Sequence, residues 1–521
     1  MQVRAGMHAA DAALRFADAT ALTSPQGSET FGELDATANR VASGLLACGL
    51  AVGDRVGVLS YNRPEVVHAW LGCERAGLVR VVLHSHFEFA THVGLLQHIG
   101  ARAIIFDTRF ADAVAAYRSD LGGDVLLIAI GDDPPDWSLS WQSVLDAGSA
   151  APAPLDVDET TPAFIQPTTG TTGTPKPWIV THRSWTAVIN QNLHHLDTFA
   201  PGIASAGPQD VVLHVHALQW ATGFQLLYPY LIRGARTVLV DDSGFDPAAV
   251  LDVIVDEQVT SVLLPGPMLT PLLDEIDRRG GIKHSLTRVV IFFATPELLE
   301  RTTKLLGPVW CHGFGSTEQG AVTTRLLASE VAEDPTRLGS VGRAGSPFFE
   351  VAVVDGAGQR VAPGQTGEIV VRSAMSTSTY WDMPDRTAAA FLPGDWFRPE
   401  DVGYVDDAGF LYYVDRAGDS IKTSVGTVYP HAVEAAVLRH PSVANCGVVG
   451  LGDDRVVAAV VLKDGVARDG SLLDSISQAA APGLKPHEQP EIIVLDELPT
   501  VLGGAKVQRG VLRDRLALLG S

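Results

Sequence analysis

The chain of 521 residues is too long for a single hydrophobic core, so two or more domains are expected. Its composition, 46% hydrophobic and 19% charged, is typical of a globular protein and excludes a disordered one. A net charge of −22 argues against a surface for nucleic acid or an anionic membrane, so any anionic ligand must be held by a local cluster of donors.

The first part of the chain alternates segments of helical and of strand character. Residues 31–50 carry apolar side chains at helical spacing, and a short apolar run follows at 56–59. This alternation predicts parallel sheet covered by helices. The further segments expected are helices near 64–76 and 90–98, strands near 79–84 and 103–106, and buried strands at 238–240 and 262–264 within a second alternating region at 211–268.

Between residues 338 and 415 the pattern changes to short apolar runs separated by turns such as Asp355-Gly356 and Asp407-Ala408-Gly409. It predicts a β-rich subdomain. The roughly 100 residues that follow are enough for an independent α+β unit. The expected fold is a large N-terminal α/β domain of mixed and parallel sheets with a β-rich subdomain, followed by a small α+β C-terminal domain.

A loop rich in threonine and glycine follows the first alternating region. It is the run Thr168-Thr169-Gly170-Thr171-Thr172-Gly173-Thr174-Pro175-Lys176. The glycines let the backbone approach an anion, the threonines donate hydrogen bonds, and Lys176 adds a positive charge. This composition indicates a polyphosphate site, although the spacing is not the G-x-x-x-x-G-K-[ST] of P-loop NTPases. A flexible surface linker is the alternative for the loop taken alone.

Four further motifs accompany the loop, in a fixed order along the chain. They are Gly313-Phe314-Gly315-Ser316-Thr317-Glu318, Trp396-Phe397-Arg398-Pro399-Glu400-Asp401, Asp415-Arg416 through Ile421-Lys422, and Ala505-Lys506-Val507-Gln508-Arg509. With the loop, they resemble the signature of the adenylate-forming superfamily, which contains acyl-CoA synthetases, amino-acid adenylation domains and beetle luciferases. Weaker similarity extends from Thr30 to Leu512. The acyl-CoA synthetase branch fits best, since no motif indicates luciferase oxidation.

The resemblance implies a core domain at 1–417 and a mobile catalytic domain at 418–521. Thr317 would bond the α-phosphate of ATP, and Glu318 and Thr172 would hold Mg²⁺. A solvated turn is the plainer alternative for Thr317 and Glu318. The nucleotide-binding residues implied in this core domain are Thr168, Thr169, Gly170, Thr171, Thr172, Gly173, Lys176 and Gly315.

Four charged residues complete the implied site. Asp401 would accept hydrogen bonds from the ribose hydroxyls, and Arg416 would reach the ribose or the phosphate. Lys506 would bridge carboxylate and phosphate while the acyl-adenylate forms. Rotation of the C-terminal domain would then replace its loop by the one after Lys422 and admit the thiol of coenzyme A. Without the motif context, such residues are normally solvated surface charges.

The apolar and aromatic segment 216–224 resembles the acyl pocket of the family. No Asp or Glu occurs from Val211 to Val240, where amino-acid-activating relatives carry a carboxylate for the substrate's ammonium group. An apolar, uncharged acyl group is therefore favoured, although ordinary core packing is compatible with the same aromatic residues. The substrate-binding residues expected from the resemblance are His216, Trp220, Gly223, Phe224, Phe292, Phe293 and Gly313.

Several glycines of the family are replaced in this chain. Pro177 removes an N–H donor after the loop, Phe292-Phe293 stands where two glycines are usual, and Pro399-Glu400 replaces Thr-Gly. The smaller departures are Gly418 at the hinge, where Asp or Lys is usual, and Val425 and Ala505 in place of glycine.

Three functions are compatible with this pattern. The first is a complete acyl-CoA ligase for a bulky apolar acid of a secondary pathway. The second is an enzyme that only converts a preformed acyl-adenylate into a thioester. The third is a non-catalytic protein that binds acyl-adenylate or nucleotide. Retention of the charged motif residues favours the complete ligase.

The ligands expected are ATP or AMP, Mg²⁺, coenzyme A and a small carboxylic acid, without nucleic acid or membrane; a homodimer is left open. We expect a cytoplasmic protein, because four scattered cysteines show no disulfide spacing and no 18-residue uncharged apolar run occurs. The pairs His84/His86 and His214/His216 each place two imidazoles on one strand face. No third metal ligand is suitably spaced, so packing or hydrogen-bonded histidines are expected.

Overall fold

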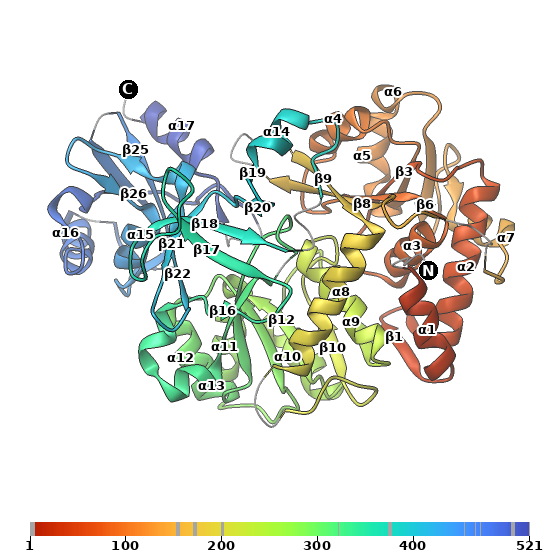
Figure 1. Cartoon of the computed structure of the whole chain (residues 1–521), viewed down its shortest axis with the longest axis horizontal. Coiled ribbons are helices and arrows are strands. Elements are labelled where there is room, and N and C mark those ends of the chain that lie inside the picture. Colours follow the sequence, from red (N-terminus) through yellow and green to blue (C-terminus); the bar gives the residue numbers. More distant parts are fainter. Residues whose placement is uncertain are drawn as a thin grey trace. The chain divides into compact units, whose positions relative to one another are not determined.

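The computed structural model describes residues 6–152, 157–169, 175–199, 203–320, 322–373, 378–452, 454–463, 465–468, 470–501 and 506–519 (Figure 1). The chain folds into two compact units. The large unit comprises Met1–Leu338, Gly342–Glu350 and Val371–Phe397. The small unit comprises Gly339–Val341, Val351–Val370 and Arg398–Ser521. Among the described residues, no helix is long and apolar enough to cross a bilayer.

The first sheet of the large unit has seven strands in the order β7-β6-β5-β3-β4-β8-β9. All neighbours are parallel except β8 and β9, which form an antiparallel hairpin. The predicted strands at 56–59, 79–84 and 103–106 are confirmed as β3, β4 and β5. The strands are β3 (Arg55–Leu59), β4 (Val79–Leu83), β5 (Ala103–Asp107), β6 (Leu126–Ile130), β7 (Leu139–Ser140), β8 (Pro162–Thr169) and β9 (Pro175–Thr181).

The second sheet of the large unit has nine strands in the order β16-β15-β14-β13-β12-β10-β11-β1-β2. The strands from β14 to β1 in this order are parallel, and antiparallel strands close both edges. The strands are β1 (Thr20–Ser24), β2 (Gly27–Thr30), β10 (Val211–His214), β11 (Arg236–Leu239), β12 (Ser261–Pro265), β13 (Arg288–Phe292), β14 (Trp310–Phe314), β15 (Thr324–Leu327) and β16 (Arg343–Ala344).

Some helices of the large unit begin at a residue whose side chain accepts a hydrogen bond from one of their first N–H groups. Thr30 forms a capping box with Glu33 at the start of α2, and Thr181 caps α8 through the backbone N–H of Ser184. The helices are α1 (Gly6–Phe16), α2 (Phe31–Ala47), α3 (Pro64–Arg75), α4 (Ala90–His98), α5 (Ala111–Ala116), α6 (Arg118–Leu121), α7 (Trp141–Ala147), α8 (His182–Asp197), α9 (Ala221–Ile232), α10 (Pro247–Asp256), α11 (Gly266–Arg278), α12 (Pro296–Leu306), α13 (Ala328–Glu333) and α14 (Pro384–Ala389).

The core between the two sheets surrounds a buried cation. The guanidinium of Arg80 lies 4.5 Å from the ring centroid of Trp70, 4.7 Å from that of Phe164 and 4.8 Å from that of Phe224. Each contact is a cation–π interaction, which is strongest where water is excluded. Residues from α3, β8 and α9 thus meet around one charge.

The small unit contains part of the β-rich segment (339–341, 351–370 and 398–415) and the C-terminal α+β unit. The β21–β22 hairpin turns at Asp407-Ala408-Gly409, as predicted, and β25, β26 and β27 form a second sheet. One face of that sheet packs on α15 and α16, and the other packs on Leu512 and Leu516 of α17. The elements are β21 (Asp401–Val405), β22 (Leu411–Arg416), β23 (Ile421–Lys422), β24 (Thr427–Val428), α15 (Pro430–Leu438), β25 (Val443–Leu451), β26 (Arg455–Leu462), α16 (Gly470–Ala480), β27 (Glu491–Val494), β28 (Thr500–Val501), β29 (Lys506–Val507) and α17 (Arg509–Leu519).

The remaining strands lie at the points where the chain passes from one unit to the other. The first two span such a point, and the last two are short strands just before residue 398. The strands are β17 (Glu350–Val354), β18 (Gly367–Arg372), β19 (Phe391–Leu392) and β20 (Trp396–Phe397). The predicted fold class, a large α/β domain of mixed sheets and a smaller α+β domain, is confirmed. The compact units assign 351–370 and 398–417 to the small unit, and the domain boundary after 417 stays a prediction.

Candidate active site

The β8–β9 hairpin carries the threonine-rich loop. Thr168 pairs with Lys176 and Thr169 with Pro175, so the loop leaves the sheet at the carboxyl end of β8. Ligands of open α/β sheets bind at this edge. The loop residues Gly170, Thr171, Thr172 and Gly173 lie outside the described residues, as does Thr174.

The proline that follows the loop is accommodated in the hairpin. Pro177 faces Pro167, so both residues of this pair lack an N–H donor. The carbonyl of Pro177 accepts a hydrogen bond of 2.8 Å from the backbone N–H of Trp381. The replacement of glycine at 177 therefore leaves β9 regular.

The Gly313–Glu318 motif ends β14, at the carboxyl edge of the nine-stranded sheet. The Ser316 hydroxyl donates to Oε2 of Glu318 over 3.0 Å, and the Tyr380 hydroxyl donates to Oε1 over 3.2 Å. The pKa of Tyr380 is raised mainly by burial and secondly by the negative charge of Glu318, so the phenol stays protonated and can donate. Sequence reasoning missed Tyr380, whose contact links residues from distant motifs.

Tyr380 is attached to the loop hairpin as well as to Glu318. It forms a β-bridge with Trp178 of β9, and the two rings meet edge to face with centroids 4.8 Å apart. The backbone N–H of Ile179 donates to Thr379 over 2.8 Å. One segment thus connects the strand after the loop with the carboxylate at the end of β14.

The two phenylalanines that replace glycines have opposite environments. Phe292 is buried among Leu263, Val290 and Cys311, and its ring would lie 3.1 Å from a Cβ added at Gly313. Phe293 is 57% exposed and has φ +55°. Glycine takes this left-handed backbone without strain, whereas other residues take it at a cost of roughly 1–2 kcal/mol.

The predicted acyl segment divides between the core and a half-buried aromatic group. Phe224 belongs to the core around Arg80, and a Cβ at Gly223 would come within 2.7 Å of the Leu218 backbone at the start of α9. Trp220 is only half-buried, and its ring stacks on His84 with centroids 4.0 Å apart. Sequence reasoning did not include His84 in this site, although its position directly after β4 marks the same edge of the sheet.

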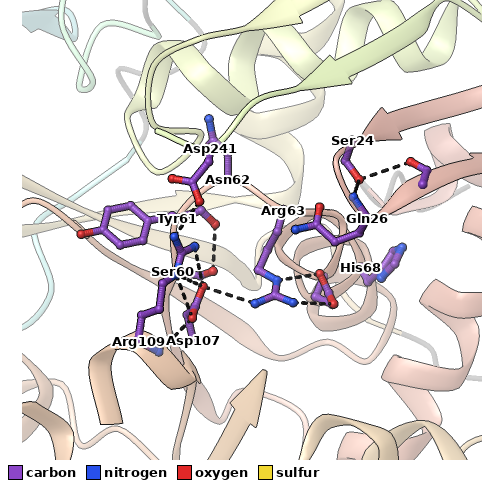
Figure 2. Close-up of polar contacts among 12 residues, drawn as sticks. Ser24, Gln26, Ser60, Tyr61, Asn62, Arg63, His68, Asp107, Arg109 and Asp241 are labelled. Carbon is purple, nitrogen blue, oxygen red and sulfur yellow. Dashed lines mark hydrogen bonds and ion pairs between the residues drawn. The ribbon is translucent and has the colours of Figure 1, made fainter. Parts of the chain in front are cut away.

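Asn62 holds the backbone at the start of the acyl segment through two hydrogen bonds. The Asn62 side chain donates to the carbonyl of His216 over 3.0 Å and accepts from the N–H of Leu218 over 2.7 Å. Beside it, the carboxylate of Asp107 at the end of β5 accepts hydrogen bonds from Arg63 and Arg109, and Arg109 also donates to Asp241 (Figure 2). The backbone at His216 and Leu218 is therefore held by Asn62, which follows β3 of the seven-stranded sheet.

Three of the four histidines in the predicted pairs are buried, whereas His86 is exposed and its Nε2 lies 3.1 Å from Oδ2 of Asp242. Burial is the main cause that lowers the pKa of His84 and His214 to about 3 and that of His216 to about 4, so all three are neutral. His216 shares a contact of 3.3 Å between its Nε2 and the Thr222 hydroxyl. Within the described part of the chain, no group of three potential ligands could hold a metal ion.

In the small unit, Asp401 and Arg416 face each other across the β21–β22 hairpin. The Arg416 Nε lies 3.4 Å from Oδ1 of Asp401, whose side chain is 7% exposed. Glu400, where the family has glycine, has φ +65°, and its carbonyl accepts from the N–H of Ala417 over 2.8 Å. As at Phe293, a bulkier residue keeps the left-handed backbone of a glycine.

The two lysine segments of the small unit lie in short hairpins. Lys422 ends β23, and its Nζ donates to the Thr427 hydroxyl over 3.0 Å. Lys506 begins β29 and pairs with Val501, and Ala505 lies outside the described residues. Arg509 follows, and it binds Glu434 at 2.8 Å and Asp419 at 3.0 Å, which ties α17 to α15 and to the turn after Arg416.

Family models identify this arrangement. The model described as AMP-binding enzyme matches residues 9–381, and the model described as AMP-binding enzyme C-terminal domain matches residues 432–502. The chain belongs to the AMP-binding enzyme family. The predicted membership of the adenylate-forming superfamily, in its acyl-CoA synthetase branch, is confirmed, and the chain is an enzyme of the acid–thiol ligase class.

Characterised relatives match nearly the whole chain. An indoleacetate–CoA ligase of Aromatoleum aromaticum is 31% identical, over 96% of this chain and 95% of its own. A feruloyl-CoA synthase of an Amycolatopsis species is 30% identical, over 93% of this chain and 94% of its own. The crystal structure of an anthranilate CoA ligase in complex with anthranoyl-AMP has a TM-score of 0.89 at 22% identity, covers 100% of this chain and 98% of its own, and shows the fold alone.

Proposed function

We propose that the protein is an AMP-forming acyl-CoA ligase for a bulky, largely apolar acid of the aromatic class. The observation that carries the proposal is the position of Glu318, a carboxylate held by two hydroxyl donors at the end of β14 and joined through Tyr380 to the hairpin of the phosphate loop. The relatives named for indoleacetate and ferulate support the aromatic class.

In the first half-reaction, the acid's carboxylate attacks the α-phosphorus of ATP and pyrophosphate leaves. Thr168, Thr169 and Lys176 belong to the hairpin that would hold the departing phosphates. Glu318 fits Mg²⁺, because its oxygen atoms are hard ligands and each hydroxyl occupies only part of an oxygen's acceptor capacity. Bound there, the ion would neutralise phosphate charge.

In the second half-reaction, the thiol of coenzyme A attacks the acyl carbonyl and AMP leaves. Asp401 and Arg416 would bind the ribose and phosphate of the nucleotide through both steps. Lys506 would act in adenylation and the segment after Lys422 in thioester formation. Catalysis in this scheme consists mainly of positioning and charge neutralisation.

The glycine replacements are compatible with the complete ligase. Phe293 and Glu400 keep φ at +55° and +65°, so the backbone that glycine normally supplies at these positions is retained. Pro177 is accommodated opposite Pro167. These observations support adenylation together with thioester formation.

The test is ATP–pyrophosphate exchange across a panel of aromatic and aliphatic acids, with CoA thioester formation measured in parallel. Both activities are expected with at least one aromatic acid. Exchange absent with every acid, together with conversion of supplied acyl-adenylate to thioester, would replace the proposal by the thioester-only enzyme. Absence of both activities would leave the non-catalytic binding protein.

A further inference from the structure

A buried imidazole lies beneath the half-buried aromatic rings of the acyl segment. His84 is 2% exposed, stacks on Trp220 at an interplanar angle of 25°, and meets the Phe87 ring edge to face with centroids 5.2 Å apart. Phe87 and Trp220 are themselves edge to face, with centroids 6.0 Å apart. The three rings form one group, the His84 cluster, in which only Phe87 and Trp220 are partly exposed.

The backbone carbonyl of Pro167 interacts with one ring nitrogen of His84, and neither nitrogen makes a hydrogen bond of regular geometry in the described part of the chain. A buried polar group without a partner costs free energy, and such groups are rare in folded proteins. Hydrogen bonds to an imidazole form in the plane of the ring. Stacking on Trp220 covers one face of the ring and does not block its in-plane directions, and the Pro167 carbonyl faces only one of the two nitrogens.

Other polar atoms without a hydrogen-bond partner lie on neighbouring positions of the same edge. Oε1 of Gln166 and Oε1 of Gln219 are buried and unpaired, and Nε2 of Gln166 donates to the carbonyl of Gln219 over 3.4 Å. Because Val81 pairs with Ile165, Gln166 of β8 lies next to the end of β4, where His84 follows. The surroundings of Trp220 therefore contain both aromatic rings and unpaired polar atoms.

We propose that the His84 cluster selects an aromatic acid that carries one uncharged hydrogen-bonding substituent, a hydroxyl or amino group, and that His84 binds this substituent. A neutral imidazole offers one donor and one acceptor and therefore suits a hydroxyl or an amine. Among the described residues, no Arg lies over the ring of Phe87 or Trp220, and the His84 imidazole is neutral.

This inference rests on the proposed function and refines its acid. The pKa of His84, lowered to about 3 mainly by burial, agrees with a neutral ring at every pH of interest. A site built around a hydrogen bond to the substrate rejects the analogue that lacks the group, since the polar atom of the site is then left unpaired.

The experiment compares matched acids on the wild type and on His84→Phe. The pairs are benzoate with its 2-, 3- and 4-hydroxy and 2-amino derivatives, and cinnamate with 4-hydroxycinnamate. We expect the wild type to prefer one substituted acid by about tenfold or more in kcat/KM for pyrophosphate exchange, as one hydrogen bond allows. His84→Phe keeps an aromatic ring and should abolish that preference.

Two further variants separate specificity from stability. His98→Phe changes an exposed histidine and should keep the wild-type preference. His84→Gln retains a donor and an acceptor and should keep part of it, which a purely structural role of the ring would not explain. It also serves if His84→Phe does not fold. An unchanged preference in His84→Phe would overturn the inference. If that variant does not fold, a wild-type preference for the unsubstituted acids would overturn it.

Calorimetric binding of the same acid pairs distinguishes this inference from the proposed function. If exchange is absent with every acid, the proposed ligase fails while the binding preference still tests His84. Preferential binding of a substituted acid, lost in His84→Phe, would support the inference in that case. Equal affinity within every pair would overturn it.

Discussion

The hydroxyl of Tyr380 donates a hydrogen bond of 3.2 Å to Oε1 of Glu318, a residue 62 positions earlier in the chain. Tyr380 also forms a β-bridge with Trp178, in the strand that follows the phosphate loop. The orientation of the proposed Mg²⁺ ligand is thereby coupled to the hairpin that would hold the phosphates.

Tyr380→Phe should weaken the affinity for ATP in the presence of Mg²⁺ by about two- to tenfold, the value of one lost hydrogen bond. The affinity for AMP measured without metal should be unchanged, because Glu318 would interact with the nucleotide only through Mg²⁺. Calorimetry with and without Mg²⁺ measures both. Tyr117→Phe, in which a partly buried tyrosine outside the site is changed, is the control. An equal loss for ATP with and without Mg²⁺ would refute a positioning role.

Lys506→Ala should abolish pyrophosphate exchange and largely spare thioester formation from supplied acyl-adenylate. The side chain would act on charge that develops only while pyrophosphate leaves, so its contribution belongs to the first transition state. Assays of each half-reaction on the same preparation test this separation. Equal loss of both activities would show that Lys506 is not specific to adenylation. Lys463→Ala, which changes another lysine of the small unit, is the control.

Glu400→Gly should stabilise the small unit. Glu400 has φ +65°, a conformation that costs a residue other than glycine roughly 1–2 kcal/mol. Glycine removes this cost, although its greater conformational entropy in the unfolded chain offsets part of the gain. A higher midpoint of urea unfolding is expected. Glu497→Gly, at an exposed position without positive φ, should lower the midpoint. If both variants lower it equally, the left-handed backbone at 400 carries no strain.

The stability of the large unit should depend on pH through Glu74. Burial raises the pKa of this carboxyl from 4.5 to about 7, while Arg80 opposes the shift. The folded state therefore binds more protons than the unfolded state between these values, so the free energy of unfolding should fall as pH rises from 4.5 to 7. Thermal unfolding across this range measures the slope.

Glu74→Gln should flatten this slope, and it should lower the unfolding temperature at pH 8 because Arg80 then lacks its counter-charge. Glu88→Gln changes an exposed carboxylate and is the control. A wild-type slope that persists in Glu74→Gln would assign the pH dependence to other groups.

Sequence patterns predicted the local structure well because their causes are local. Apolar residues at period 3.6 bury one face of a helix whatever it packs against, so the segments at 31–50 and 64–76 became α2 and α3. The motif around Thr317 and Glu318 follows its strand as expected, because a turn rich in glycine is determined by backbone conformation. The side-chain roles at the site stay predictions.

The amino-acid sequence by itself determined the family of this protein, its alternating elements and the motifs that reach the carboxyl edges of the sheets. Only the tertiary structure decided that Phe292 is buried while Phe293 is exposed, that Phe224 packs around Arg80, and that Tyr380 holds Glu318. It also placed His84 under Trp220, 136 positions apart. The physical reason is that these contacts depend on strand order and register, which bring together residues whose local sequences carry no record of each other.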